Sequence, residues 1–327
     1  MDYRSLDDLS KAILHNRHKV PQDVDLIVGI PRSGVFAGNL LGLLWNIPVT
    51  DLDGYLKNTE LVLTNPHSVR RAIAYPREAR HILLIDDTIH SGRSMDHARE
   101  LLMGVDVDQK ITSCAVFANP KPKSITRINI FFETLPSPAV LEWNVMHRDK
   151  LEQFCVDIDG VLCRNPTRHE DDDGAEYRKF LSNVTPLMIP TYKVGYLVTG
   201  RLEKYRKDTE EWLNRHNVAY NELIMLDLPD KATRIKRNAA PRFKADVYKS
   251  LNDSHLFIES EMKEARVISE LSGKAVLCFS NQKFLTPKFS RALVALKTRA
   301  LVGWLVKKGG RAIAKLDITN SRYYSKI

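Results

Sequence analysis

Short apolar runs alternate with longer amphipathic stretches through the first half of the chain. The runs at 25–30 (DLIVGI), 79–85 (ARHILLI) and 112–118 (TSCAVFA) have the length and composition of strands buried in a parallel sheet. Between them, the stretches at 34–45 and 93–103 have the apolar spacing of helices. This alternation of strand and helix predicts a parallel α/β sheet.

A second series of apolar runs follows in the second half. Its predicted strands are 154–158 (FCVDI), 194–199, 222–226, 255–258 and 275–279. We therefore predict two consecutive three-layer α/β domains, over 1–150 and 151–282, and a basic amphipathic tail over 283–327. Ligands of such sheets bind beyond the carboxyl ends of the strands, so polar residues at those ends are the first candidates for function.

Charge is distributed unevenly along the 327 residues. The net charge is +9, but 283–327 alone hold eleven Lys/Arg and one acidic residue. The other 282 residues then carry 38 basic and 39 acidic groups, so the body of the protein is close to neutral. This distribution argues against a nucleic-acid-binding body. Four scattered cysteines, no apolar signal core and no run of 18 apolar residues predict a cytoplasmic protein.

The first chemical motif lies at 82–95, ILLIDDTIHSGRSM. An apolar strand leads into two acids, Asp86 and Asp87, and then into a Ser-Gly-Arg-Ser loop at a predicted helix start. Backbone N–H groups and hydroxyls at a helix N-terminus form a cradle for a phosphate monoester. The two carboxylates before it can accept hydrogen bonds from the vicinal hydroxyls of a sugar. The residues of the predicted cradle are Ser91, Gly92, Arg93 and Ser94.

This motif resembles the signature of type I phosphoribosyltransferases, which bind phosphoribosyl pyrophosphate. The resemblance implies that Asp86 and Asp87 hold the ribose hydroxyls and that the loop holds the 5-phosphate. In the fragment Gly29–Gly34 (GIPRSG), Arg32 and Ser33 correspond to the family's pyrophosphate loop. The residues before the first strand and those at 121–143 are too few for the hood that grips a base in the purine and pyrimidine enzymes, so a nucleobase is not implied.

The second motif follows the strand at 154–158. Asp157 and Asp159 stand two residues apart, before Gly160, in FCVDIDGVL. An aspartate at a strand end can attack phosphorus, and a second carboxylate nearby can protonate the leaving oxygen. The motif resembles the first motif of haloacid-dehalogenase-like phosphatases, which implies that Asp157 is the nucleophile and Asp159 the acid/base, with Mg²⁺ beside them.

Three later segments match the remaining motifs of this phosphatase family in order. Thr199 in LVTGR corresponds to the hydroxyl that binds phosphoryl oxygens. Lys244 corresponds to the stabilising cation, with Lys231 and Lys236 as alternatives. In LFIESE, Glu259 and Glu261 take the place of the usual aspartates as metal ligands beside Asp157 and Asp159, with Glu264 as an alternative.

The spacing of the phosphatase motifs leaves room for only a minimal cap domain. Such an open site is typical of relatives that act on bulky substrates. The acidic segment at 169–173 (HEDDD) either orders a small flap or is a solvated loop.

The tail combines apolar and basic residues over 287–308. This pattern is typical of a helix lying on an anionic bilayer, and it predicts peripheral attachment at the inner face of the cytoplasmic membrane. The alternative is a terminal helix packed on the phosphatase domain.

Together the motifs predict a bifunctional enzyme, because a phosphatase could remove the phosphate that the transferase introduces. The whole chain resembles phosphoribosyltransferase–phosphatase fusions associated with ribofuranose in bacterial surface polysaccharides, including its EWN and LEKYR segments at 142–144 and 202–206. The resemblance implies a glycan acceptor, lipid-linked in view of the tail, and a β-ribofuranosyl product. Asp51 and Asp53 are candidates for the acceptor base or ordinary turn acids.

Two other functions remain open. One is a nucleotide-salvage phosphoribosyltransferase joined to a nucleotidase. The other is an RNA-binding regulator that senses phosphoribosyl pyrophosphate.

Overall fold

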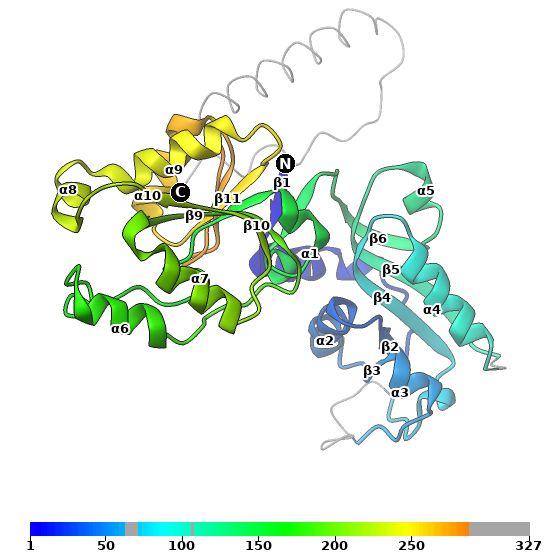
Figure 1. Ribbon diagram of the computed structural model, residues 1–327. Coiled ribbons are helices and arrows are strands. Elements are labelled where there is room, and N and C mark those ends of the chain that lie inside the picture. Colours follow the sequence, from blue (N-terminus) through cyan, green and yellow to red (C-terminus); the bar gives the residue numbers. More distant parts are fainter. Residues whose placement is uncertain (63–70, 106–107, 288–327) are drawn as a thin grey trace, which may run out of the picture. The chain divides into compact units, whose positions relative to one another are not determined.

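The computed structural model describes residues 1–62, 71–105 and 108–287. The chain divides into two compact units, which we call unit 1 (1–148) and unit 2 (149–327) and describe separately (Figure 1).

Unit 1 is built on a five-stranded parallel sheet with the order β3-β2-β4-β5-β6. Successive residues of its strands face opposite sides, so Ile27 and Leu83 belong to one apolar cluster and Leu26 and Leu84 to another. Both faces are therefore covered, which explains why the strands read as continuous apolar runs. The strands of unit 1 are β1 (Asp2–Arg4), β2 (Leu26–Gly29), β3 (Val49–Asp51), β4 (His81–Ile89), β5 (Lys110–Ala118), β6 (Ile130–Thr134) and β7 (Ala139–Leu141).

The helices of unit 1 divide between the two faces of this sheet. Helices α1 and α2 contribute Ile13 and Leu41 to the cluster on one face, and α3 and α4 contribute Tyr55 and Met95 to the cluster on the other. The helices, including the 3₁₀ turns η, are α1 (Leu6–Asn16), η1 (Arg17–Lys19), α2 (Ser33–Trp45), α3 (Leu52–Leu56), η3 (Pro76–Glu78), α4 (Arg93–Met103), α5 (Pro122–Ile125) and η4 (Glu142–Asn144).

The N-terminus of the chain pairs with a segment near the end of unit 1. Strand β1 runs parallel to β7 in a separate two-stranded sheet. The Glu142 carboxylate, just after β7, accepts a hydrogen bond from the first N–H of α1 at Leu6, 2.8 Å away. These short flanking segments, which we expected to be too small for a hood, thus form an ordered substructure beside the main sheet.

Unit 2 is built on a six-stranded sheet with the order β10-β9-β8-β11-β12-β13, in which only β13 is antiparallel. Its strands are β8 (Phe154–Val156), β9 (Val194–Leu202), β10 (Tyr220–Leu226), β11 (Leu256–Glu259), β12 (Val276–Cys278) and β13 (Lys283–Leu285). Strand β13 extends the sheet past the predicted domain end at residue 282.

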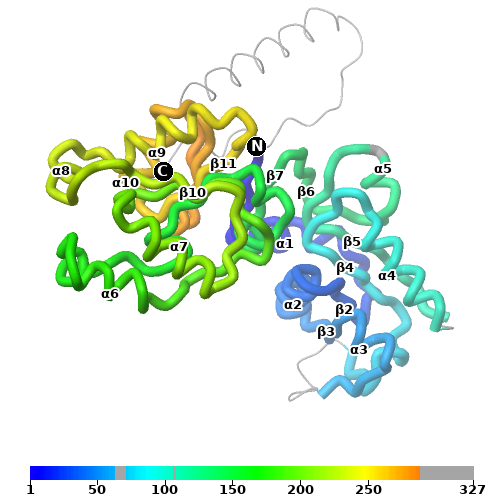
Figure 2. Tube along the Cα trace, viewed as in Figure 1, coloured from blue at the N-terminus to red at the C-terminus, as the bar shows by residue number. Residues whose placement is uncertain are grey.

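Helices lie on both sides of the sheet of unit 2 (Figures 1 and 2). Helices α9 and α10 pack Tyr248 and Ile268 against strand residues such as Phe257, and α6 and α7 lie on the other side. The helices are η5 (Asp149–Gln153), α6 (Ala175–Asn183), η6 (Glu203–Tyr205), α7 (Arg206–Arg215), α8 (Lys231–Lys236), α9 (Ala239–Ser250) and α10 (Met262–Ser272).

The strands and helices predicted from apolar patterning are present, and the mixed α/β class with parallel sheets is confirmed. The predicted helix at 93–103 coincides with α4, whereas β4 runs four residues past its predicted end and contains both acids of the first motif. The predicted membrane segment at 287–308 lies outside the described residues except for Pro287.

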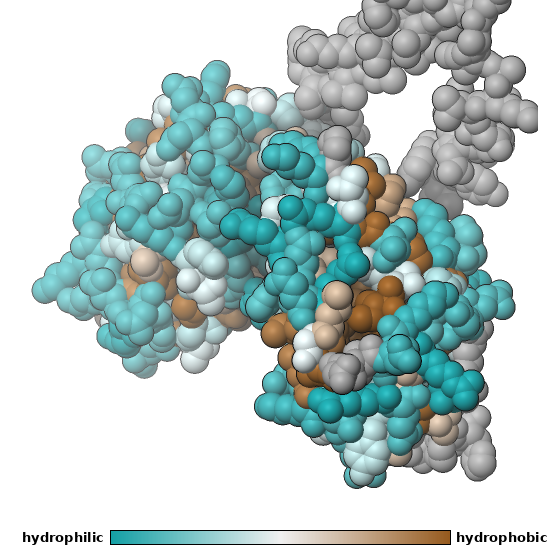
Figure 3. Space-filling model, turned by 90° about the vertical axis from the view of Figure 1, so that its right-hand side faces the viewer, coloured by the Kyte–Doolittle hydropathy of each residue, from teal (hydrophilic) through white to brown (hydrophobic). Residues whose placement is uncertain are grey.

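Most of the surface seen in Figure 3 is hydrophilic, with hydrophobic residues gathered in patches. Phe36, Leu43 and Leu44 on α2 are exposed. Within the described parts of the chain, no helix is long and apolar enough to span a membrane.

Candidate functional site

The two acids of the first motif lie at the carboxyl-terminal end of β4. Strand β2 ends at Gly29 opposite Ile85, so the chain after β2 passes beside the acids. There the Ser33 hydroxyl donates a hydrogen bond to the Asp87 carboxylate at 2.8 Å. The structure therefore brings together the two fragments that lie more than 50 residues apart in the sequence.

Asp87 is buried and its carboxylate is largely occupied by protein donors. Besides Ser33, the indole N–H of Trp143 donates to it at 2.7 Å and the Thr88 hydroxyl at 3.1 Å. The Trp143 ring also stacks on Phe117 of β5. Asp87 thus links β4, the loop after β2 and the EWN segment.

Asp86 has a different environment. Its carboxylate accepts the backbone N–H of Asp87 at 2.9 Å. Burial, together with the negative charge of Asp87, raises the pKa of Asp86 well above its usual value. A ligand that donates hydrogen bonds or brings positive charge would relieve this unfavourable ionisation.

The predicted phosphate loop begins helix α4. Gly92 precedes the helix with a φ of 81°, in the left-handed region that glycine adopts without strain. Any Cβ at Gly92 would also collide with the Arg127 side chain, which forms an ion pair with Asp96. The other loop residues, Ser91, Arg93 and Ser94, are exposed and available to a ligand.

Other predicted residues of unit 1 have local partners or face solvent. Arg32 is exposed before α2. Asp51 caps α3 by accepting the Gly54 N–H at 2.7 Å, and Asp53 forms an exposed ion pair with Lys57. Asp51 ends the edge strand β3 and Asp53 follows it in α3, and β2 separates this strand from the acids on β4.

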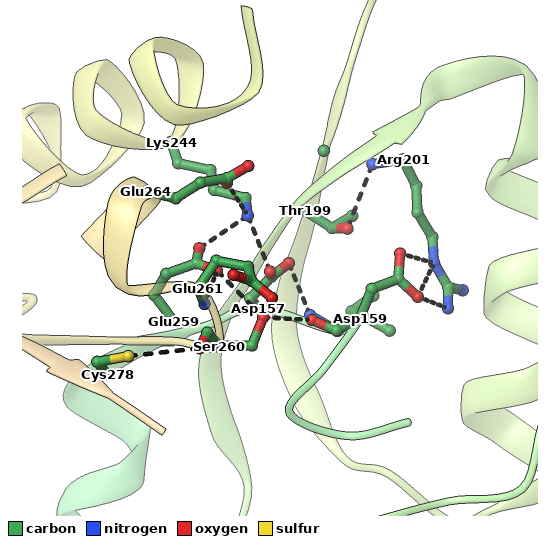
Figure 4. A network of polar contacts seen from close by, with 12 residues as sticks. Asp157, Asp159, Thr199, Arg201, Lys244, Glu259, Ser260, Glu261, Glu264 and Cys278 are labelled. Carbon is green, nitrogen blue, oxygen red and sulfur yellow. Dashed lines mark hydrogen bonds and ion pairs between the residues drawn. The ribbon is translucent and has the colours of Figure 1, made fainter. Parts of the chain in front are cut away.

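The second candidate site lies at the carboxyl ends of β8, β9 and β11 in unit 2. Lys244 reaches it from α9, and its Nζ lies 2.8 Å from Asp157, 2.8 Å from Glu259 and 3.0 Å from Glu264 (Figure 4). Lys244, Asp157 and Glu259 are each at most 3% exposed. Of the three candidate lysines, Lys244 reaches Asp157, while Lys231 pairs with Asp171. We call this group of three acids and one lysine the Lys244 cluster.

Electrostatics in the Lys244 cluster are tightly coupled. Burial raises the pKa of Asp157 well above its usual value, against the opposing effect of Lys244, and the charge of Glu259 adds to the rise. Burial alone would lower the pKa of Lys244, but the charges of Asp157, Glu259 and Glu264 raise it well above its usual value. The ammonium therefore stays charged and partly neutralises the three acids.

Asp159 forms a separate ion pair beside the Lys244 cluster. Arg201 is fully buried and donates to it from Nη2 at 2.7 Å and from Nε at 3.1 Å. Although burial alone would raise the pKa of Asp159, the charge and hydrogen bonds of Arg201 hold it below its usual value. Asp159 is therefore a carboxylate in the resting protein.

Two further features define the same corner of unit 2. Gly160 has a φ of 80°, and any Cβ there would collide with Ser260. This turn lets the chain reverse just after Asp159. Thr199 is buried on β9 and accepts the Arg201 backbone N–H at 3.3 Å.

A pocket of about 410 Å³ opens on these residues. It is lined by Asp157, Asp159, Thr199, Lys244 and the three candidate metal-binding glutamates, Glu259, Glu261 and Glu264. Among these glutamates, Glu259 and Glu264 contact Lys244, whereas Glu261 is exposed and precedes α10.

The chemistry of this lining bears on the predicted magnesium ion. In the described residues, no group of three His, Cys, Asp or Glu side chains is placed to hold a metal ion, and Lys244 Nζ stands among the acids of this pocket. The donors are nevertheless carboxylate oxygens, which Mg²⁺ prefers, and their negative charge exceeds that of the one lysine. The donor set therefore fits Mg²⁺ in chemistry.

The acidic segment 169–173 forms part of the pocket wall and is not a merely solvated loop. Asp171 lines the pocket and pairs with Lys231 of α8 at 2.9 Å. Asp172 accepts backbone N–H groups at the start of α6, and Asp173 pairs with Lys204. These contacts tie the segment to α6, α8 and η6.

Sequence reasoning missed two residues that the structure places beside the candidate catalytic groups. Trp143 contacts Asp87, and Arg201 neutralises Asp159. Both stood in quoted motifs, EWN and LVTGR, but a residue's partner across the sheet cannot be read from the local sequence.

Comparison with known proteins finds a family similarity in unit 1. Residues 3–141 match the family model of the phosphoribosyl transferase domain. The search of curated proteins finds no match.

Several solved structures resemble part of the chain. The Helicobacter pylori xanthine-guanine-hypoxanthine phosphoribosyltransferase is 18% identical, with 44% of this chain and 92% of that chain covered and a TM-score of 0.32. A purine phosphoribosyltransferase from Pyrococcus horikoshii is 16% identical, with 43% and 92% covered and a TM-score of 0.32. Orotate phosphoribosyltransferase from Aeropyrum pernix is 11% identical, with 39% and 70% covered and a TM-score of 0.28.

The family match covers the loop after β2, both acids of β4 and the predicted phosphate loop at the start of α4. It supports pentosyltransferase activity with phosphoribosyl pyrophosphate as the donor. The similarity to the phosphoribosyl transferase domain is thus confined to residues 3–141, which lie within unit 1.

Proposed function

We propose that the protein is a bifunctional enzyme of polysaccharide biosynthesis. Unit 1 transfers a 5-phosphoribosyl group from phosphoribosyl pyrophosphate to a glycan, and unit 2 removes the 5-phosphate to leave a β-ribofuranosyl unit. The observation that carries the proposal is the Lys244 cluster beside Asp159 and Thr199, because it adds a second phosphate-handling pocket to a chain with a phosphoribosyltransferase domain.

In the transfer step, Asp86 and Asp87 accept the ribose hydroxyls and the loop at 91–94 holds the 5-phosphate. Arg32 and Ser33 hold the pyrophosphate. The bond between ribose C1 and the pyrophosphate oxygen breaks, and an acceptor hydroxyl oxygen forms the new bond to C1 from the opposite face. The hydroxyl proton leaves to a base. The sequence candidates Asp51 and Asp53 lie at the edge strand β3, on the same side of β4 as the proposed pyrophosphate loop, so neither is assigned this role.

In the hydrolytic step, a carboxylate oxygen of Asp157 attacks phosphorus and the ribose oxygen leaves. Lys244 and Thr199 stabilise the charge on the transferring phosphoryl group. Asp159 gives a proton to the leaving oxygen and takes one from the water that hydrolyses the aspartyl phosphate. Arg201 holds Asp159 as a carboxylate, the form that must take the proton from water. An incoming phosphate dianion favours protonation of Asp159, which yields the form that can give a proton to the leaving oxygen.

Magnesium is the expected cofactor of unit 2. Asp157, Asp159, Glu259 and Glu261 would hold it, with Glu264 as an alternative ligand. When bound, Mg²⁺ supplies positive charge that neutralises the phosphate oxygens.

A nucleotide-salvage function is equally compatible with the phosphoribosyltransferase domain. It differs in the acceptor, which would then be a nucleobase. The acceptor panel described next therefore includes nucleobases as well as glycans.

The test is to incubate the protein with phosphoribosyl pyrophosphate and a panel of lipid-linked glycans, synthetic glycans and nucleobases, and to identify products by mass spectrometry. The wild type is expected to add an unphosphorylated pentose to a glycan. Asp157→Asn removes the nucleophile, so the glycan should instead gain a phosphorylated pentose. Its rate of dephosphorylation should fall at least about 10³-fold.

Asp246→Asn is the matched control, since Asp246 is exposed on α9, two residues from Lys244 and on the opposite side of the helix. It should behave as the wild type. Changing Asp86 and Asp87 together to Ala should give the reverse defect, with no transfer but normal hydrolysis of a prepared phosphoribosyl glycan. Unphosphorylated product from Asp157→Asn, or modification of nucleobases alone, would refute the proposed function.

A further inference from the structure

A polar cluster lies at the carboxyl ends of β4, β5 and β6 that no step above uses. It consists of His90 just after β4, Asn119 just after β5 and Ser137 in the segment after β6. Asn119 Nδ2 lies 3.2 Å from His90 Nδ1 and 2.8 Å from Ser137 Oγ, and Ser137 Oγ lies 3.1 Å from His90 Nδ1. The three side chains therefore form one closed network.

The backbone around this network fixes how the Asn119 amide is turned. The Lys121 N–H donates to Asn119 Oδ1 at 3.1 Å, so the oxygen of the amide faces Lys121. The NH₂ group must then face His90 and Ser137. Because Asn119 is 3% exposed and its own N–H is bonded to the Ile89 carbonyl, the side chain has little freedom to turn over.

This orientation determines the tautomer of His90. An NH₂ group has no lone pair to offer, so His90 Nδ1 must accept from it. The Ser137 hydroxyl can point its proton at the same nitrogen, since it receives a hydrogen bond from Asn119. A neutral imidazole whose Nδ1 accepts carries its proton on Nε2.

His90 is exposed although both its ring and its backbone are anchored. The Ser124 hydroxyl donates to the His90 carbonyl, which holds the main chain between the acids and the phosphate loop. Within the described residues, none of the hydrogen bonds engages His90 Nε2. An N–H donor with a fixed direction is thus presented at the surface, three residues after Asp87 and one before Ser91.

The strand order indicates which reactant this donor faces. The loop proposed to bind pyrophosphate follows β2, on one side of β4, whereas Asn119 and Ser137 follow β5 and β6, on the other side. An incoming hydroxyl attacks C1 from the face opposite to the departing pyrophosphate. The acceptor is therefore expected over β5 and β6, where the His90 network lies.

We infer that His90, held by Asn119 and Ser137, donates a hydrogen bond from Nε2 to an oxygen of the acceptor and so orients it for transfer. The inference rests on the proposed transferase function and deepens it, because it assigns the acceptor side of the site. An N–H donor fits an acceptor that offers a lone pair, such as a sugar oxygen. His90 is a specificity-determining residue in this role and is distinct from the base that takes the proton.

The experiment compares steady-state transfer by the wild type, His90→Ala and His97→Ala, with the glycan acceptor found in the panel above. His97 is an exposed histidine on α4 and serves as the matched control. His90→Ala should raise KM for the acceptor about tenfold, the factor expected for one lost hydrogen bond, with KM for phosphoribosyl pyrophosphate little changed. His97→Ala should change neither.

A second variant separates orientation from mere packing. Asn119→Asp keeps the acceptor for the Lys121 N–H but turns the group facing His90 from a donor into an acceptor, so the imidazole proton should move to Nδ1. Nitrogen-15 NMR of histidine-labelled protein should report the Nε2–H tautomer for His90 in the wild type and a proton on Nδ1 in Asn119→Asp. Acceptor KM should rise in this variant as in His90→Ala, and the double variant should be no worse than either.

An Nδ1–H tautomer in the wild type, or a His90→Ala defect confined to the donor KM, would overturn the inference. These results are distinguishable from failure of the proposed function. If the wild type modifies only nucleobases, the polysaccharide function fails, while the inference is still judged by the acceptor KM for that base. If the wild type transfers to no acceptor, the inference is judged by the tautomer of His90 that NMR reports.

Discussion

Unit 2 neutralises its buried carboxylates with its own cations, whereas unit 1 leaves the groups assigned to the donor phosphates facing solvent. Lys244 and Arg201 are almost completely buried against Asp157 and Asp159. In unit 1, Arg32 and the loop residues Ser91, Arg93 and Ser94 are exposed. The pocket of unit 2 is thus organised before any ligand arrives, whereas the loop that we propose binds phosphate in unit 1 would be completed by its ligand.

This difference has energetic consequences. Removing one partner of a buried ion pair leaves an uncompensated charge in a medium that solvates it poorly, so such a change costs stability as well as activity. Removing an exposed donor costs affinity for the ligand and little else. The comparison therefore predicts where a substitution acts on folding and where it acts on binding.

The largest effect on stability is expected for Lys244→Met. The substitution leaves Asp157, Glu259 and Glu264 facing one another without a cation, and it should lower the free energy of unfolding of unit 2 by about 3–5 kcal/mol. Denaturant unfolding followed with a probe in unit 2 measures it.

Two other variants serve as controls for the unfolding measurement on Lys244→Met. Lys236→Met changes an exposed lysine of α8 and should leave stability within about 0.5 kcal/mol of the wild type. Ser91→Ala with Ser94→Ala should be equally stable but bind phosphoribosyl pyrophosphate more weakly in calorimetry. Equal stability of Lys244→Met and Lys236→Met would show that the Lys244 cluster is not the buried network described above.

An intermediate loss of stability is expected in unit 1 at Asp87. This residue differs from the exposed residues of the unit because its carboxylate is buried and bonded to protein donors. Its carboxylate accepts from both Ser33 and Trp143, so Asp87→Asn leaves one of these donors facing an NH₂ group. The variant should be less stable by about 1–3 kcal/mol. Thermal unfolding monitored by circular dichroism measures this loss.

Asp86→Asn should instead raise the free energy of unfolding at neutral pH. The pKa of Asp86 is raised in the folded state above its ordinary value of 3.8 by burial and by Asp87, so its ionisation there is unfavourable. The wild type loses stability from this group as pH rises from 3.8 through the folded pKa. Asp86→Asn lacks that loss, so its advantage should grow over that range and vanish near pH 3.8. An advantage independent of pH would contradict this account.

Much of the fold was predictable because apolar runs report burial directly. The strands around Ile27, Leu83 and Phe257 are covered on both faces, and their sequences show it. The three-residue strands β1 and β7 were not predictable, since their pairing depends on segments more than 130 residues apart. The order of strands and helices can be predicted from local sequence, whereas the pairing of short strands that lie far apart in the chain cannot.

The candidate sites divide in the same way. Asp86, Asp87, Asp157 and Asp159 follow apolar runs within local motifs, so the sequence points to them. The choice of Lys244 over Lys231 needed the structure, because both lie on helices that precede β11 and only the packing of α9 brings Lys244 to Asp157. The tautomer inferred for His90 likewise depends on Asn119 and Ser137, which follow β5 and β6.

The smallest effect is expected at the end of unit 2, where the sheet meets the basic tail. Strand β13 pairs antiparallel with β12 over Lys283–Leu285, so a chain ending at Asn281 loses an edge strand. A chain ending at Pro287 keeps it and loses only residues that carry most of the positive charge of 283–327. The shorter protein should melt a few degrees lower than the intact chain. The longer one should melt as the intact chain does.

Binding to membranes should separate the same proteins differently. Attraction between basic residues and anionic head groups weakens with ionic strength, whereas apolar insertion does not. The intact chain should sediment with anionic vesicles at low salt and be partly released at high salt, and both truncated proteins should stay in solution. If 288–327 instead pack on unit 2, ending the chain at Pro287 should lower the melting temperature and leave vesicle binding unchanged. That pair of results would contradict the membrane hypothesis. It would indicate that the tail, like the rest of unit 2, is stabilised by contacts within the unit.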